Sequence, residues 1–208
     1  MNSLSLNNIG KKFNHDWIFK RVNLQLYTGD ILAVTGSNGS GKSTLLQLMC
    51  AYLAPSEGEI KWSLNEKIIE PEFVYLHFSI SSPALQLIED FKLTEMLDFY
   101  FKFKKIKNNF SLSDLLKISE LENHAQKHIK DFSSGMKQRL KLLLAFASDT
   151  AFLLLDEPCS NLDKAAIEWY KANLRLFSGE RIIIVCSNNI DDELFICNKS
   201  ISMESFKN

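Results

Sequence analysis

The sequence predicts an α/β fold whose core is a mostly parallel β-sheet. Largely apolar runs at residues 31–34, 151–155 and 181–186 carry this prediction, because strands of a parallel sheet are buried on both faces and lose the alternation of half-buried strands. A helical segment at residues 164–177 separates the last two runs, as expected where a helix crosses over between parallel strands. The chain has 208 residues, which favours a single domain spanning residues 1–208.

The N-terminal residues predict an antiparallel β subdomain. Apolar and polar residues alternate at 3–6 and at 22–27, with a turn at 14–16 between them, which is the pattern of half-buried antiparallel strands. A further strand is predicted at 60–64. The apolar residues 73–76 are expected to return to the buried sheet.

A mostly helical subdomain is expected at about residues 77–132, inserted into a core made of residues 1–76 and 133–208. Apolar residues at helical spacing predict a helix within 93–107, and we interpret its aromatic stripe as core. Ser113 is expected to cap a second helix.

The segment that follows the first buried run has the form G-x-x-x-x-G-K-[ST], which predicts a phosphate-binding loop and a phosphate-loop NTPase core. Glycines are required because the backbone N–H groups must wrap closely around phosphate oxygens at positive φ. Lys42 would bind the β and γ phosphates, and Ser43 would offer its hydroxyl to Mg²⁺. The predicted nucleotide-binding residues of this loop are Gly36, Ser37, Asn38, Gly39, Ser40, Gly41, Lys42, Ser43 and Thr44.

Two carboxylates follow the second buried run. Asp156 and Glu157 would lie where the carboxyl edge of the sheet meets the phosphate loop, which is where ligands bind in open α/β folds. Asp156 is expected to hold Mg²⁺ through its water shell, and Glu157 to orient or deprotonate the water that attacks the γ-phosphate.

Composition narrows the class of protein. The formal net charge of -1 and the pI near 6.4 give no basic excess for nucleic acid, so no nucleic-acid partner is expected. The four cysteines form no metal-binding spacing and are interpreted as buried thiols in a reducing compartment. No apolar run approaches the roughly 18 residues that a membrane span needs, and the start of the chain does not resemble a signal peptide, so we expect a cytoplasmic protein.

Residues 132–139, FSSGMKQR, together with residues 156–163, DEPCSNLD, resemble the signature and adjoining motifs of the ATP-binding cassette (ABC) family. The resemblance covers nearly the whole chain. It implies an ATPase subunit of a membrane transporter that uses ATP and Mg²⁺. Two nucleotide-binding domains, as a homodimer or a heterodimer, would close around ATP and drive a separate membrane-spanning subunit at the inner face of the membrane.

The resemblance also assigns further nucleotide contacts. Ser133, Ser134 and Gly135 would face the γ-phosphate of a nucleotide held by the opposite protomer, and a capped helix start is consistent with such an anion site. Asp163 would belong to the same interface. Phe13 occupies the position of the family's adenine-stacking aromatic residue.

The chain departs from the family at two expected γ-phosphate sensors. His77 and its neighbours stand where the family has a glutamine after a core strand, and Asn188 takes the place of the switch histidine. Asn188 is therefore a candidate catalytic residue of a slowed ATPase, although it can equally be a turn residue. A histidine in the altered loop of a short single cassette resembles the haem-exporter subfamily used in cytochrome c maturation.

Other functions remain open at this point. One is a soluble, non-transport cassette protein that acts as an ATP-gated clamp, and another is a slow ATPase with a mainly regulatory role. A small-molecule phosphoryl transferase would share the phosphate loop but would not explain the signature segment or residues 160–163.

Overall fold

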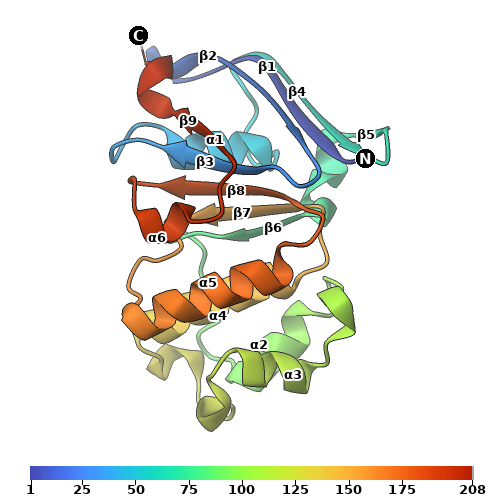
Figure 1. Ribbon diagram of the computed structural model, residues 1–208, viewed down its shortest axis with the longest axis vertical. Helices are drawn as coiled ribbons and strands as arrows, with labels where there is room; N and C mark the ends of the chain where they lie inside the picture. Colours follow the sequence, from blue (N-terminus) through green and yellow to red (C-terminus); the bar gives the residue numbers. More distant parts are fainter. Residues whose placement is uncertain (208) are drawn as a thin grey trace.

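Two β-sheets and a set of helices are stacked along the long axis of the molecule (Figure 1). The structure is a computed structural model that describes residues 1–207. The five-stranded sheet has the order β6-β7-β8-β3-β9, and all its strand pairs are parallel. Its strands are β6 (Phe78–Ser81), β7 (Phe152–Asp156), β8 (Ile182–Ser187), β3 (Ile31–Thr35) and β9 (Lys199–Ser202). The predicted α/β fold with a mostly parallel core is thereby confirmed.

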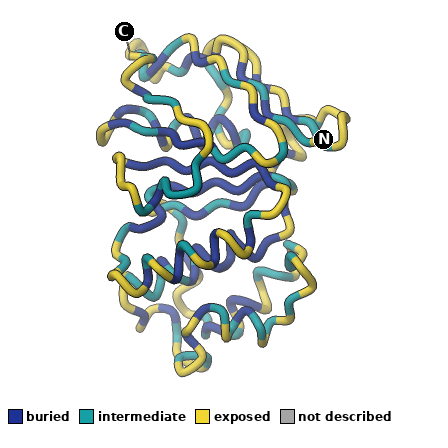
Figure 2. Tube along the Cα trace, viewed as in Figure 1, coloured by how far each residue is buried: buried dark blue, intermediate teal, exposed yellow. Residues whose placement is uncertain are grey.

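The central strands of this sheet are buried on both faces. Every residue of β7 and β8 is buried, and Figure 2 shows the buried trace running along the sheet. Leu153 and Leu155 of β7 pack with one core cluster, whereas Phe152 and Leu154 pack with the other. The sheet therefore separates two hydrophobic layers, which is why its strands read as continuous apolar runs.

The antiparallel subdomain has four strands in the order β2-β1-β4-β5. They are β1 (Ser3–Phe13), β2 (Asp16–Tyr27), β4 (Glu57–Leu64) and β5 (Lys67–Ile69). Helix α1 (Lys42–Met49) joins the layer between this sheet and the parallel one. Trp62 of β4 packs in that layer, and its indole N–H donates to the carbonyl of Met49 at 2.6 Å, which ties the end of α1 to the antiparallel sheet.

Helices cover the other face of the parallel sheet (Figure 1). The helices are α2 (Leu93–Tyr100), α3 (Leu112–Ile118), α4 (Ser134–Ala147), α5 (Lys164–Ser178) and α6 (Asp191–Leu194). Short 3₁₀ turns complete the fold as η1 (Pro71–His77), η2 (Lys107–Asn109), η3 (Glu122–His124), η4 (Ile129–Asp131) and η5 (Met203–Phe206). None of the helices within residues 1–207 is long and apolar enough to cross a membrane.

The prediction that residues 73–76 form a core strand was wrong. These residues lie in η1, which begins at Pro71, and Phe73 and Tyr75 are exposed. Proline favours the start of a helical turn and supplies no N–H for a sheet. The sheet strand is instead β6, where Phe78 pairs with Phe152 and the two rings stack at 4.4 Å. Because β6 belongs to the core, the helical insert begins after it and not at residue 77.

Two details of the helical subdomain also differ from the prediction. Helix α2 ends at Tyr100, and Phe103, which was expected in the apolar stripe, is 72% exposed. The cap of α3 is Ser111 and not Ser113. Its hydroxyl accepts a hydrogen bond from the N–H of Asp114 at 3.1 Å, while the carboxylate of Asp114 accepts from the N–H of Ser111. This reciprocal capping box fixes the helix start two residues earlier than predicted.

Arg181, immediately before β8, is 1% exposed although it is charged. Its guanidinium donates to the carbonyls of Phe146 and Ser148 at the end of α4, and to the carbonyl of Thr150. Burial lowers the pKa of Arg181 to about 10, so the group stays protonated at neutral pH. The arginine therefore satisfies carbonyls at a helix end that the sheet would otherwise leave buried and unpaired.

We expect Arg181→Leu to lower the free energy of unfolding by about 3 kcal/mol or more, because several buried carbonyls lose their donor at roughly 1 to 3 kcal/mol each. Arg175→Leu is the matched control. Arg175 is exposed on α5 and its guanidinium lies over the ring of Phe195, so the loss should stay within about 1 kcal/mol. Urea denaturation measures both changes, and equal losses would contradict the structural role of Arg181.

Candidate nucleotide site

Three loops leave the same edge of the parallel sheet. Thr35 pairs with Ser187, and Asp156 pairs with Cys186. Strands β3, β7 and β8 therefore end side by side, and the residues that follow them lie close together (Figure 1). The loop after β3 is the predicted phosphate loop.

The phosphate loop has the backbone that its glycines predict. Gly36, Gly39 and Gly41 have φ values of 148°, 75° and 100°, in the region that side chains disfavour. A Cβ on Gly41 would also lie 2.8 Å from Ile18. Gly41 precedes α1, and no side chain caps the start of this helix in the described chain. Its first N–H groups are therefore available to an anion.

Lys42 points back into the loop and is only 5% exposed. Its ammonium donates to the carbonyls of Gly36 and Ser37, at 2.8 and 3.1 Å, and to Oδ1 of Asn188 at 2.6 Å. Three neutral acceptors thus hold the cation. A triphosphate would offer charged oxygens in exchange, and charge-assisted bonds to anions are stronger.

Asn188 connects the three loops. Its Nδ2 donates to Oδ1 of Asn38 at 2.8 Å and to Oε1 of Glu157 at 3.1 Å, while its Oδ1 accepts from Lys42. A neutral amide can do this because it has a donor end and an acceptor end, and a lysine ammonium only donates. Asn188 is thus the asparagine that belongs to this network. Asn189 instead turns the chain, with a φ of 62°.

Asp156 and Ser43 lie together beside the loop. Burial raises the pKa of Asp156, whereas the hydroxyl of Ser43 lowers it. The carboxyl oxygen Oδ1 of Asp156 is buried and has no hydrogen-bond partner among the described residues. An unpaired buried carboxylate oxygen next to a serine hydroxyl is a donor set that suits a hard cation such as Mg²⁺.

Glu157 follows Asp156 directly and lines the pocket of the phosphate loop. Its φ of 47° lies in the left-handed region, which is uncommon for a residue with a Cβ and occurs often at functional sites. Its N–H donates to the carbonyl of Cys186 at 2.9 Å. The carboxyl group therefore leaves the sheet at a fixed point, within reach of Asn188.

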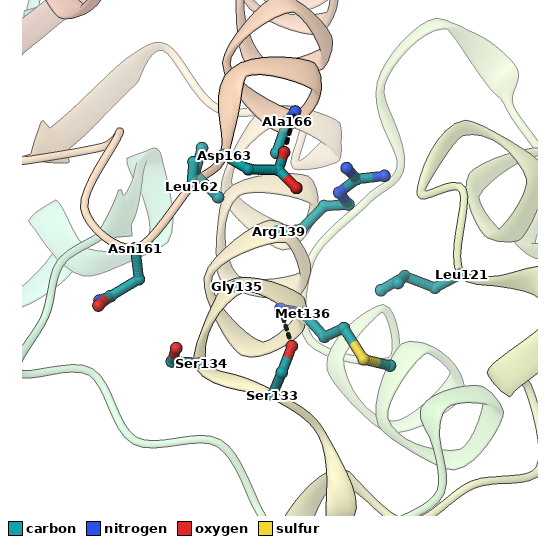
Figure 3. A pocket seen from close by; sticks show the side chains of 10 residues that line it. All are labelled: Leu121, Ser133, Ser134, Gly135, Met136, Arg139, Asn161, Leu162, Asp163 and Ala166. Atoms are coloured by element: carbon teal, nitrogen blue, oxygen red, sulfur yellow. Dashed lines mark hydrogen bonds between the residues drawn. The ribbon is translucent and has the colours of Figure 1, made fainter.

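The signature residues form a second pocket. Figure 3 shows Ser133, Ser134, Gly135 and Asp163 around it. Ser133 and not Ser134 caps α4, by accepting from the N–H of Met136 at 3.2 Å, and Asp163 caps α5 by accepting from the N–H of Ala166 at 2.8 Å. This pocket shares none of its lining residues with the pocket of Glu157 and the phosphate loop. Within one chain, the two predicted halves of the nucleotide site are separate.

Two residues singled out from the sequence, Phe13 and His77, do not line the pocket of the phosphate loop. Phe13 ends β1 and is 46% exposed beneath the ammonium of Lys11, but the pocket of the phosphate loop is lined by Ile18. His77 lies in η1, before β6, so Ser82 is the residue that follows the core strand. Ser82 shares a pocket with Ser43 and Asp156. The histidine therefore gives no support to a resemblance to haem exporters.

Sequence reasoning missed Glu204, which lies in η5 near the end of the chain. Its Oε1 accepts from the N–H and the hydroxyl of Ser37, at 2.7 and 3.1 Å, and its Oε2 accepts from Ser202. The hydrogen bond from the Ser37 N–H is the main reason why the pKa of Glu204 is lowered to about 2. No motif marks this residue, since the contact exists only because β9 returns beside β3.

Comparison with known proteins identifies the family. Residues 19–160 match the family model described as ABC transporter, which covers more than half of the chain. The chain belongs to the ABC transporter family. It is 32% identical over 197 residues to the ABC transporter ATP-binding protein YtrE of Bacillus subtilis, covering 89% of this chain and 85% of that protein. It is 28% identical over 214 residues to the taurine import ATP-binding protein TauB of Roseobacter denitrificans, covering 98% and 78%.

Solved structures agree on the fold of this ABC ATP-binding subunit. The ATP-binding subunit of an ABC transporter superposes with a TM-score of 0.81 at 22% identity, covering 96% of this chain and 85% of that one. A dimeric ATP-binding cassette in a post-hydrolysis state with ADP and Pi gives 0.80 at 23% identity, covering 96% and 93%.

The low pKa of Glu204 predicts a pH-dependent contribution to stability. Because the folded pKa of about 2 lies below the unfolded value of 4.5, the contribution is complete above pH 4.5 and is lost as the pH falls toward 2. Glu204→Gln should therefore lower the melting temperature at pH 6, and the difference from the wild type should shrink at pH 3. Glu66→Gln, in the exposed turn between β4 and β5, is the control and should show no such trend. A pH-independent difference would contradict the contact.

Proposed function

We propose that this chain hydrolyses ATP and, as one of a pair of nucleotide-binding domains, drives a separate membrane-spanning transporter subunit at the inner face of the membrane. The observation that carries the proposal is the hydrogen-bonded group of Lys42, Asn188 and Glu157 at the edge of the sheet. These residues combine a phosphate-binding cation, a neutral sensor and a candidate base in one place.

The residues have separate tasks in this proposal. The N–H groups of the phosphate loop and of α1 bind the β and γ phosphates, and Lys42 exchanges its carbonyl partners for phosphate oxygens. Ser43 and Asp156 hold Mg²⁺, which neutralises charge on the phosphates. Glu157 then orients the attacking water and takes its proton, since its carboxyl group lines the same pocket.

A dimer supplies what one chain lacks. The pocket of Ser133, Ser134 and Gly135 does not include the phosphate loop, so a phosphate bound at the start of α4 would belong to a nucleotide held by another copy or by a related chain. A head-to-tail pair, homodimeric or heterodimeric, places the signature of each protomer over the phosphate loop of the other. The similarity to a dimeric cassette supports this arrangement.

Substitutions at the two sensor positions favour slow turnover. Ser82 follows β6 where the family has a glutamine, and Asn188 replaces the switch histidine. An amide gives a γ-phosphate oxygen a neutral hydrogen bond, which is weaker than the charge-assisted bond of an imidazolium. A soluble ATP-gated clamp is not favoured, because the relatives described above are named as transporter and import ATP-binding proteins.

We expect Glu157→Gln to keep ATP binding, to stop turnover and to accumulate an ATP-bound dimer, because the amide preserves the shape of the side chain and removes the base. Size-exclusion chromatography with ATP and phosphate release measure the two effects. Lys42→Ala is the control that should lose tight ATP binding and therefore show no dimer. Hydrolysis at the wild-type rate, or a Glu157→Gln variant that stays monomeric with bound ATP, would count against the assignment.

Asn188→His should raise ATP turnover several-fold, since a bond about 1 kcal/mol stronger in the transition state corresponds to roughly five- to tenfold in rate. Asn188→Ala should lower turnover. The same substitutions at Asn189 are the matched controls, because Asn189 does not bind Lys42 or Glu157 in the structure. Steady-state phosphate release measures all four variants. Changes below about twofold throughout would show that Asn188 is only a turn residue.

A further inference from the structure

Glu193, in α6, is completely buried with 0% exposure. Its Oε1 accepts a hydrogen bond from the N–H of Cys159 at 3.0 Å. Its Oε2 has no hydrogen-bond partner in the part of the chain that the structure describes. A buried carboxyl group with one unpaired oxygen disfavours folding. Stability alone therefore does not account for a glutamate at this position.

No cation among residues 1–207 forms an ion pair with the carboxyl group of Glu193. Burial raises the pKa of Glu193, whereas the hydroxyl of Ser187 and the amide of Cys159 lower it, and the negative charges of Glu157 and Asp156 raise it further. The ammonium of Lys171, on the adjacent helix α5, binds Asp192 at 2.7 Å instead. The hydrogen-bond donor to the buried carboxyl group is thus the Cys159 amide, and the hydroxyl of Ser187 lies close to the same group.

Cys159 lies two residues after Glu157, in the turn that leaves β7. Glu157 has a positive φ, a strained backbone conformation that persists only where contacts of the neighbouring residues fix it. The orientation of the Glu157 side chain therefore depends on those contacts. The N–H of Glu157 is held by Cys186, and the carbonyl of Pro158 accepts from Gln138 at 2.9 Å. At the next residue, Cys159, the hydrogen bond from its N–H to Glu193 fixes the chain.

Glu193 reaches this turn from the element that follows Asn188. Helix α6 begins three residues after Asn188, and the hydroxyl of Ser187 accepts from the N–H of Ile190, which closes the chain between them. The turn with Glu157 and the turn with Asn188 are therefore linked twice. The first link is the Asn188 to Glu157 hydrogen bond within the site, and the second is the Glu193 to Cys159 bond in the core beneath it.

We propose that Glu193 is a positioning residue for ATP hydrolysis, whose buried carboxyl group ties the turn carrying Glu157 to the helix that follows Asn188. The two groups that face the γ-phosphate then keep a fixed relative position. This inference rests on the proposed role of Glu157 as the group that activates water. Glu193 itself does not touch the nucleotide.

The test compares Glu193→Ala with Glu193→Gln in steady-state ATP turnover. Glu193→Ala should lower kcat by about tenfold with the KM for ATP changed by less than about twofold, because the phosphate loop keeps its contacts. Glu193→Gln retains an acceptor oxygen for Cys159 and should recover kcat to within about twofold of the wild type. Ser79→Ala is the control for lost stability, because it removes a buried hydrogen bond to Thr150 at the opposite edge of the sheet.

Hydrogen exchange of the Cys159 amide in the nucleotide-free protein is a second readout that does not depend on turnover. The amide should be protected in the wild type and in Glu193→Gln, and should exchange faster in Glu193→Ala. The proposal is overturned if this amide stays protected in Glu193→Ala, or if Glu193→Gln is as slow in turnover as Glu193→Ala. A kcat loss that Ser79→Ala reproduces at equal melting temperature would overturn it too. If Glu157→Gln hydrolyses ATP normally, the role of Glu157 fails, while amide exchange still decides whether Glu193 holds the turn.

Discussion

Parallel pairing of β7, β8 and β3 holds three loops at one edge of the sheet. The register sets Asp156 beside Cys186 and Thr35 beside Ser187, and each loop begins at the next residue. A strand shifted by one position would turn its side chains to the other face. The buried faces on both sides of the sheet prevent that shift, so the two hydrophobic layers fix the geometry of the polar site at their edge.

Three helix starts lie at the predicted nucleotide contacts. Helix α1 offers free N–H groups at the phosphate loop, while the starts of α4 and α5, capped by Ser133 and Asp163, surround the second pocket. The helix dipoles and the unpaired N–H groups both favour anions. Because one chain keeps these anion sites apart, nucleotide binding and dimer formation become parts of the same equilibrium in the proposed function.

A neutral amide at position 188 links a cation to a carboxylate. Asn188 uses both ends of its side chain to bridge Lys42 and Glu157, which a protonated imidazole, as a pure donor, would not do for the lysine. The ammonium of Lys42 and the carboxylate of Glu157 therefore both hydrogen-bond to Asn188. The buried tie between Glu193 and Cys159 lies beneath the same two turns, so the site and its support are organised around the same pair of loops.

Local chain chemistry made much of this protein predictable from sequence. The glycine spacing before Lys42 predicted the phosphate loop because only positive φ values allow that turn, and the apolar runs predicted β7 and β8 because both faces are buried. The two serines at 133 and 134 indicated the start of α4 in the same local way, and the structure shows that Ser133 is the cap. Contacts between distant residues were not predictable. The order of the strands brings Glu204 to Ser37, 167 residues away, and the sheet takes β6, with Phe78 stacked on Phe152, in place of the more apolar residues 73–76. Sequence periodicity reports which residues are buried, but only the tertiary structure decides which buried surfaces and polar groups meet.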